Sequence, residues 1–119
     1  TKSSLLDEAK NWDLPYLPAA ATVSEILRLH DFGYQTIKLF PAGQLGGVDY
    51  IKAISAPLPE IRFVPSGGVN GENVAKYLGL NQVVAVSGSW MIPTDVVQAG
   101  DWSRLTELAA SSLRATLSP

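Results

Sequence analysis

Short apolar runs alternate with segments of helical periodicity along this chain. The apolar runs span residues 14–21, 36–40, 61–65 and 83–86. They lack a strict alternation of apolar and polar positions, which is the pattern of strands buried on both faces. Helices that separate such strands are typical of a parallel sheet covered on both sides. The pattern therefore predicts an α/β fold of four successive βα units.

Helix signals accompany these runs. Thr22 and Glu25 have the spacing of a capping box, and Asn70 and Asp101 are suited to cap two later helices. The apolar positions that recur at helical spacing are Ile26, Leu27, Val48, Ile51, Ile54, Val74, Tyr77, Leu78, Trp102, Leu105, Ala109 and Leu113. A helix-like stretch over 4–10 precedes the first strand, so we expect the chain to begin inside a βα series.

The length of the chain narrows the choice of architecture. A parallel (β/α)₈ barrel takes about 250 residues, so four units in 119 residues amount to half of one. The alternative is a small, open, doubly wound sheet, which four or five strands can form alone. No low-complexity tract or Pro/Gly/Ser linker interrupts the sequence. Residues 1–119 are therefore predicted to be one piece without an internal domain boundary.

Composition excludes several functions. The chain has no cysteine and one histidine, which rules out a disulfide framework, a thiolate nucleophile and a zinc site with Cys or several His ligands. Nine Lys and Arg against eleven Asp and Glu leave no basic surface for nucleic acid. No apolar run approaches the roughly 18 residues that span a bilayer, and the chain starts without a signal-peptide core. We expect a cytoplasmic protein without a metal, a cofactor, a nucleic-acid partner or a membrane anchor.

Lys38 lies within an otherwise apolar strand, Thr36-Ile37-Lys38-Leu39-Phe40. Burial of an ammonium group is costly, and desolvation lowers the pKa of a lysine toward neutrality. A neutral amine can attack a ketone and lose water to form a protonated imine, which then accepts electrons from a breaking carbon–carbon bond. Alternatively, the Lys38 stem carries its charge to the end of the sheet or to a carboxylate on a helix. The strand alone leaves both roles open.

Glycine and serine follow the last two predicted strands. The two segments are Pro65-Ser66-Gly67-Gly68 and Ser87-Gly88-Ser89. Adjacent glycines let the backbone approach a ligand, while hydroxyl and amide groups donate to an anion. Barrels hold phosphate after their last two strands, although plain βα turns also use glycine. If these strands are the seventh and eighth, Lys38 lies on the sixth.

The motifs together resemble a known family. The blocks that carry the resemblance are Pro15-Tyr16-Leu17-Pro18, Ala21-Thr22-Val23-Ser24-Glu25, Ile37-Lys38-Leu39-Phe40-Pro41-Ala42, Gly46-Gly47, Arg62-Phe63-Val64-Pro65-Ser66-Gly67-Gly68, Gly88-Ser89-Trp90 and Ala99-Gly100-Asp101-Trp102. In order and spacing, over nearly the whole chain, they resemble the C-terminal half of the 2-keto-3-deoxy-6-phosphogluconate (KDPG) aldolases. This family is also described as 2-keto-4-hydroxyglutarate (KHG) aldolases.

The resemblance implies a class I aldolase on a (β/α)₈ barrel, usually a homotrimer, that needs no cofactor. Such an enzyme reversibly splits KDPG into pyruvate and glyceraldehyde 3-phosphate, and 4-hydroxy-2-oxoglutarate into pyruvate and glyoxylate. This chain would supply strands five to eight, with Lys38 as the imine-forming lysine. The other implied site residues are Pro18, Thr22, Phe40 and Ser66 for substrate, and Gly67, Gly68, Gly88 and Ser89 for phosphate.

The chain also departs from the family pattern. Ser66 stands where the family usually has threonine, Ala19 and Ser87 stand where it usually has glycine, and Gly43 replaces a frequent acidic residue. No residue matches the family's general acid/base glutamate or its substrate-contacting arginine, which come from the N-terminal half. We therefore expect weak or no activity from this chain alone, and pairing of its open strand edges with another copy or with the missing half. The alternative is a non-catalytic module that binds phosphate or a sugar acid.

Overall fold

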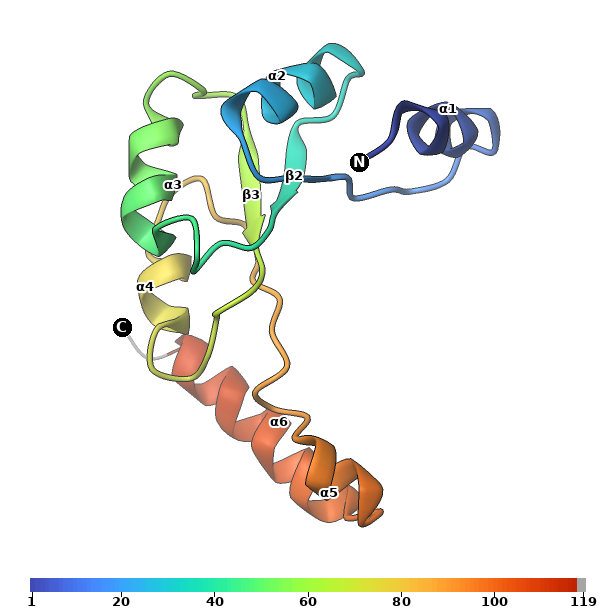
Figure 1. Cartoon of the computed structure of the whole chain (residues 1–119). Coiled ribbons are helices and arrows are strands. Elements are labelled where there is room, and N and C mark those ends of the chain that lie inside the picture. The colour runs from blue at the N-terminus through green and yellow to red at the C-terminus, as the bar shows by residue number, and fades with distance from the viewer. Residues whose placement is uncertain (118–119) are drawn as a thin grey trace.

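The computed structural model describes residues 1–117 and contains a parallel sheet with helices packed against one face (Figure 1). The elements are α1 (Ser3–Asn11), β1 (Ala19–Ala20), α2 (Val23–Asp31), β2 (Thr36–Leu39), α3 (Gly47–Ser55), β3 (Arg62–Pro65), α4 (Val74–Leu78), α5 (Thr94–Gln98) and α6 (Trp102–Leu117). The strand order is β1-β2-β3, and both pairings are parallel. The predicted α/β class and βα alternation are confirmed.

The first strand is shorter than predicted. Residues 14–18 were expected to belong to it, yet β1 contains only Ala19–Ala20. Pro15 and Pro18 have no N–H to donate to a ladder, and Leu14 remains 61% exposed. The backbone N–H of Lys38 nevertheless donates to the carbonyl oxygen of Pro18 at 2.8 Å. The prediction of a strand over 14–18 is therefore wrong, although the end of this segment still borders β2.

The fourth predicted strand is present as two separate bridges beside β3. Val83 pairs with Phe63 and Ser87 pairs with Ser66, both in the parallel sense. The pairing offset increases by one residue between the two bridges, as in a β-bulge. Pro65 lies between Phe63 and Ser66 and has no N–H, so it cannot continue the ladder. The prediction of a continuous strand over 83–86 is thus wrong, but its position next to β3 is correct.

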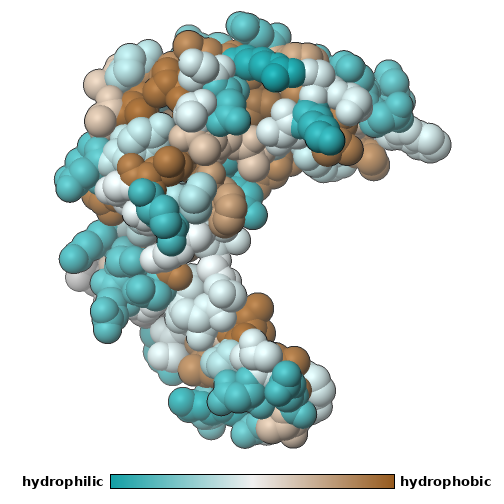
Figure 2. All heavy atoms as spheres, in the orientation of Figure 1, coloured by the Kyte–Doolittle hydropathy of each residue, from teal (hydrophilic) through white to brown (hydrophobic). Residues whose placement is uncertain are grey.

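The hydrophobic core lies between the sheet and the helices α2, α3 and α4 (Figure 1). In β2, Ile37 and Leu39 are fully buried toward these helices, whereas Thr36 and the following Phe40 are exposed. Cover on both faces was predicted, and within residues 1–117 the helices cover one. The opposite, uncovered face borders the hollow of the crescent seen in Figure 2. Lys38 belongs to this uncovered face because side chains alternate along a strand.

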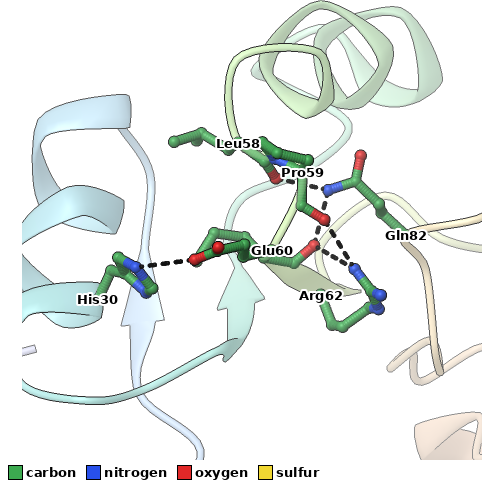
Figure 3. Close-up of polar contacts among 7 residues, drawn as sticks. His30, Leu58, Pro59, Glu60, Arg62 and Gln82 are labelled. Atoms are coloured by element: carbon green, nitrogen blue, oxygen red, sulfur yellow. Dashed lines mark hydrogen bonds and ion pairs between the residues drawn. The ribbon is translucent and has the colours of Figure 1, made fainter.

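Polar contacts hold the start of β3 in place, at the end of the sheet opposite Ser66 (Figure 3). The side-chain amide of Gln82 donates to the carbonyl oxygens of Leu58 and Ile61, each at 2.7 Å. His30, in the last turn of α2, places Nε2 3.4 Å from a carboxylate oxygen of Glu60. His30, the one histidine of the chain, is therefore a helix-end histidine and lies away from the candidate site.

Candidate functional site

Lys38 presents an unpaired amine on the uncovered face of the sheet. Its partners in register are Ala19 on β1 and Val64 on β3, which give it apolar neighbours on both sides. Within residues 1–117 its Nζ makes no ion pair or hydrogen bond, so the alternative of a salt bridge to a helix is wrong. Nζ lies 5.7 Å from the centroid of the Phe40 ring. The side chain is half-buried, because the helices pack on the other face.

A hollow of about 300 Å³ opens where β3 and residues 83–87 end, and we call it the cradle. Its lining residues are Phe40, Ser66, Gly67, Gly68, Val69, Ser87, Gly88 and Ser89. The structure thus brings together all four residues predicted to bind phosphate, along with two of those predicted to bind substrate. Phe40 is shared between the cradle and the surroundings of Lys38. No charged side chain belongs to this lining.

The turn after β3 leaves two backbone N–H groups free beside the cradle, while three of its carbonyl oxygens already accept hydrogen bonds. The carbonyl oxygens of Ser66 and Gly67 accept from the N–H groups of Ala42 and Gly43, each at 2.8 Å, and that of Gly68 accepts from Asn73 Nδ2 at 2.9 Å. The N–H groups of Gly67 and Gly68 donate to no acceptor in the described part of the chain. Both glycines have positive φ, +86° and +78°. Successive free amides of this kind attract an anion.

Three serine hydroxyls add further donors. Ser66, Ser87 and Ser89 form no side-chain hydrogen bond within residues 1–117, and each hydroxyl can donate to an oxyanion. Ser66 is 92% buried and is paired in register with Ser87, so their side chains share one face of the sheet. Ser87 belongs to a segment that was predicted to donate to an anion, although the resemblance itself assigned it no phosphate or substrate role. Its position depends on the one-residue change in pairing offset, which leaves no signal in the sequence.

Pro18 and Thr22, which the resemblance implied for substrate, lie outside the lining of the cradle. The Pro18 ring is fully buried, and its carbonyl oxygen is occupied by the Lys38 N–H. Thr22 caps α2: its Oγ1 accepts from the N–H of Glu25 at 3.3 Å and donates to Glu25 Oε2 at 3.0 Å. Neither residue offers a free polar group, and their contact with substrate stays a prediction.

The capping box makes helix α2 sensitive to acid. The N–H groups of Ala21 and Thr22 donate to Glu25 Oε2, each at 2.9 Å, and lower the pKa of Glu25 below its ordinary value. A lowered folded-state pKa stabilises the fold above the ordinary value and loses that contribution as pH falls through the folded-state pKa. Glu25→Gln should therefore cost most stability near pH 7 and progressively less below about pH 4. Urea unfolding midpoints of the unaltered chain and of Glu25→Gln, measured from pH 7 to pH 3, test this prediction. A difference between the two midpoints that does not change with pH would contradict it.

Gly43, where the family often has an acidic residue, packs directly on the turn of the cradle. A Cβ on Gly43 would lie 3.2 Å from the Gly67 carbonyl oxygen and 3.2 Å from Gly68 Cα. The 2.8 Å hydrogen bond from Gly43 to Gly67 fixes this close approach. Glycine at position 43 is therefore part of how this chain supports its cradle.

Neither a metal site nor a spanning helix is found in the described residues. No group of three or more His, Asp and Glu side chains in residues 1–117 is placed to hold a metal ion. Over the same range, every helix is too short or too polar to cross a membrane. The predictions of a cytoplasmic location and of function without metal, cofactor, membrane or nucleic acid stay predictions.

Comparison with known proteins gives one consistent family. Residues 1–108 match the family model described as KDPG and KHG aldolase. The 2-dehydro-3-deoxy-phosphogluconate aldolase of Pseudoalteromonas atlantica is 45% identical over 93% of this chain and 52% of its own length. The KHG/KDPG aldolase of Escherichia coli is 39% identical over 92% of this chain and 51% of its own length. The chain thus spans about half the length of the curated relatives it matches.

Solved structures agree with these matches. The KDPG aldolase of Legionella pneumophila, with pyruvate captured as a covalent carbinolamine, has a TM-score of 0.87 and 38% identity over 91% of this chain and 52% of that chain. The 2-keto-3-deoxy-6-phosphogluconate aldolase of Zymomonas mobilis with 3-phosphoglycerate has a TM-score of 0.85 and 28% identity, over 94% of this chain and 52% of that one. The sequence relatives and the solved structures therefore belong to the same family.

Proposed function

The chain belongs to the KDPG and KHG aldolase family, and from that premise we propose that it carries the imine-forming lysine and the phosphate cradle of a class I aldolase. The reaction is the reversible cleavage of KDPG to pyruvate and glyceraldehyde 3-phosphate, and of 4-hydroxy-2-oxoglutarate to pyruvate and glyoxylate. One observation carries the proposal. An unpaired Lys38 amine and a donor-lined hollow share the uncovered face of the sheet, with Phe40 contributing to both surroundings.

The chemistry assigned to Lys38 is covalent catalysis. Its neutral amine attacks the C2 ketone of the substrate, and loss of water from the carbinolamine gives a protonated imine. The C4 hydroxyl then gives its proton to a base, the role of the family's general acid/base glutamate, which no residue of this chain matches. As it does so, the bond between C3 and C4 breaks, its electron pair moves into the imine as an enamine, and the aldehyde leaves. Protonation of the enamine and hydrolysis release pyruvate and regenerate Lys38. The cradle holds the phosphate of the departing aldehyde through neutral donors.

Two relatives support a site with one part that binds pyruvate covalently and another part that holds a phosphate group. The Legionella pneumophila structure contains pyruvate as a carbinolamine, which is the intermediate that precedes an imine. The Zymomonas mobilis structure contains 3-phosphoglycerate, a three-carbon acid that bears a phosphate group. An amine and an anion cradle are the two features that such ligands require. In this chain, Lys38 and the turn that includes Gly67 and Gly68 provide them.

We propose further that the chain forms strands five to eight of a (β/α)₈ barrel and pairs with another copy or with the N-terminal half. The uncovered face of its sheet leaves apolar side chains in solvent: Phe40 is 52% exposed and Val84 is 54% exposed. Unpaired strand edges also favour association. Sedimentation velocity should show a complex that grows with protein concentration or forms when the other half is added. A monomer under all these conditions would contradict this proposal.

Turnover by the chain alone should be weak, because no residue matches the family's general acid/base glutamate. Such a group contributes about 10² to 10⁴ in rate. Imine formation is therefore a better test than turnover. Borohydride reduction in the presence of pyruvate, followed by peptide mapping, should place an adduct on Lys38. Failure of a folded chain to form this adduct would favour a non-catalytic module that binds phosphate or a sugar acid.

A further inference from the structure

Trp90 lies directly over Gly88, at one wall of the cradle. A Cβ built on Gly88 would overlap with Cζ3 and Cε3 of the Trp90 ring and come within 3.1 Å of the Val69 carbonyl oxygen. The six-membered ring of the indole therefore occupies the space that any other residue at position 88 would need. Glycine is required at this point because the ring and the backbone approach each other so closely.

The same indole also lies close to the end of the turn that forms the opposite wall. A Cβ on Gly71, just beyond the turn formed by residues 66–69, would lie 3.8 Å from Trp90 Nε1 and 3.9 Å from Cδ1. A side chain at position 71 would therefore be in ordinary van der Waals contact with the ring, which places the indole close to this glycine. Trp90 thus lies between Gly88 and the residue that follows the turn. Trp90 also borders a groove of about 370 Å³ whose other lining residues include Leu113 of α6.

Few other interactions hold the two walls together. The N–H of Ser87 donates to the carbonyl oxygen of Pro65 at 2.9 Å, which closes the bridge to Ser66. Beyond Ser87, no backbone hydrogen bond in the described chain joins residues 88–89 to residues 67–69. The relative position of the amides of Gly67 and Gly88 consequently depends on packing. The Trp90 indole lies close to both segments, over Gly88 on one side and beside Gly71 on the other.

We propose that Trp90 is the positioning residue of the cradle: it sets the Gly88 wall against the Gly67–Gly68 wall at the separation that an anion needs. This inference rests on the proposed function, since it assumes that the cradle binds a phosphate group. Trp90 itself belongs to the support behind the binding surface and is absent from the lining of the cradle. Its effect should therefore appear in anion affinity and leave imine formation at Lys38 unchanged.

The test compares three variants by titration with inorganic phosphate, followed through the amide resonances of residues 67, 68 and 88. Trp90→Phe keeps a flat ring over Gly88, whereas Trp90→Leu keeps apolar bulk without one. Trp90→Leu should weaken phosphate binding about tenfold or more, because misplacing a binding group by about 1 Å has effects of this size. Trp90→Phe should restore most of the affinity. Trp102→Leu, at a site that is 66% exposed on α6, is the matched control and should bind as the unaltered chain does.

Pyruvate trapping on the same samples separates positioning from general damage. Equal adduct yields in Trp90→Leu and the unaltered chain, together with a selective loss of phosphate binding, support the proposal. Phosphate affinity that is unchanged in Trp90→Leu overturns it and leaves the proposed function intact. Parallel loss of phosphate binding and trapping assigns Trp90 a purely structural role and also overturns it. An unaltered chain that binds no phosphate overturns both the cradle and its positioning residue.

Discussion

Replacement of Lys38 by methionine should abolish the pyruvate adduct formed under borohydride. Methionine matches the length and apolar stem of lysine but has no amine, so no imine can form. The neighbours in register, Ala19 and Val64, are apolar and make no polar contact with Nζ, so the substitution breaks no ion pair or hydrogen bond in the described chain. The free energy of unfolding, measured with urea, should therefore change by less than about 1 kcal/mol. Intact mass after reduction, with and without pyruvate, measures the loss of adduct.

The matched control is Lys76→Met, because Lys76 is exposed on α4 and lies outside the candidate site. This variant should form as much adduct as the unaltered chain. Phosphate binding should also survive in Lys38→Met, since no lysine lines the cradle. An adduct that persists in Lys38→Met and maps to Lys76 or another surface lysine would show nonspecific amine chemistry. That result would remove Lys38 from the mechanism.

Much of the fold could be predicted from local rules. The apolar runs of β2 and β3 and the capping box of α2 were predicted because each depends on residues close together in sequence. Asp101 also acts as a cap, because the N–H of Arg104 donates to Asp101 Oδ1 at 2.9 Å. The prediction of a cap at Asn70 is wrong: the N-cap of α4 is Asn73, and Asn70 Oδ1 accepts from the N–H of Asn73 at 3.2 Å in the turn before the helix. Such local geometry is what a pattern of residue types encodes directly.

The sequence predicted which types of residue form the candidate site, but only part of their arrangement in space. Glycine and serine after two adjacent parallel strands indicated an anion cradle, and the structure brings those residues together at one edge of the sheet. The pairing of Ser87 with Ser66 could not be predicted, because it depends on how the ladder passes Pro65. The capping role of Thr22 was predicted from its spacing to Glu25 and is confirmed. The substrate contact that the resemblance implied for Thr22 stays a prediction.

The burial of the face that carries Lys38 could not be predicted from the sequence of its strand. An apolar strand indicates burial on both faces, yet Ile37 and Leu39 alone account for the buried positions of β2. The face that carries Lys38 and Phe40 is covered by no helix of this chain. Whether such a face is buried depends on what packs against it, which the residues of the strand itself do not encode. The proposed pairing with a second copy or with the N-terminal half would cover this face.

Replacement of Gly67 by alanine should disrupt the cradle more than any single hydroxyl deletion. Gly67 has a φ of +86°, and a Cβ there would lie 3.1 Å from Phe40 Cε2 and 3.2 Å from Pro41 Cα. The left-handed conformation costs alanine about 1 to 2 kcal/mol. Because Pro41 Cα belongs to the backbone, relief of the contact requires the turn to move. Phosphate binding, measured by the same amide titration, should weaken about tenfold or more, as misplacement by about 1 Å produces effects of this size.

Gly33→Ala is the control that separates the backbone strain of a positive φ from the steric contact of the new Cβ at residue 67. Gly33 follows α2 with a φ of +92°, and a Cβ there would meet no atom within 4 Å. Both variants should lose a similar amount of unfolding free energy from the positive φ, but only Gly67→Ala should lose phosphate affinity. Equal phosphate affinities in the two variants would mean that the turn tolerates a side chain at residue 67. The predicted dependence of phosphate affinity on glycine at position 67 would then be wrong.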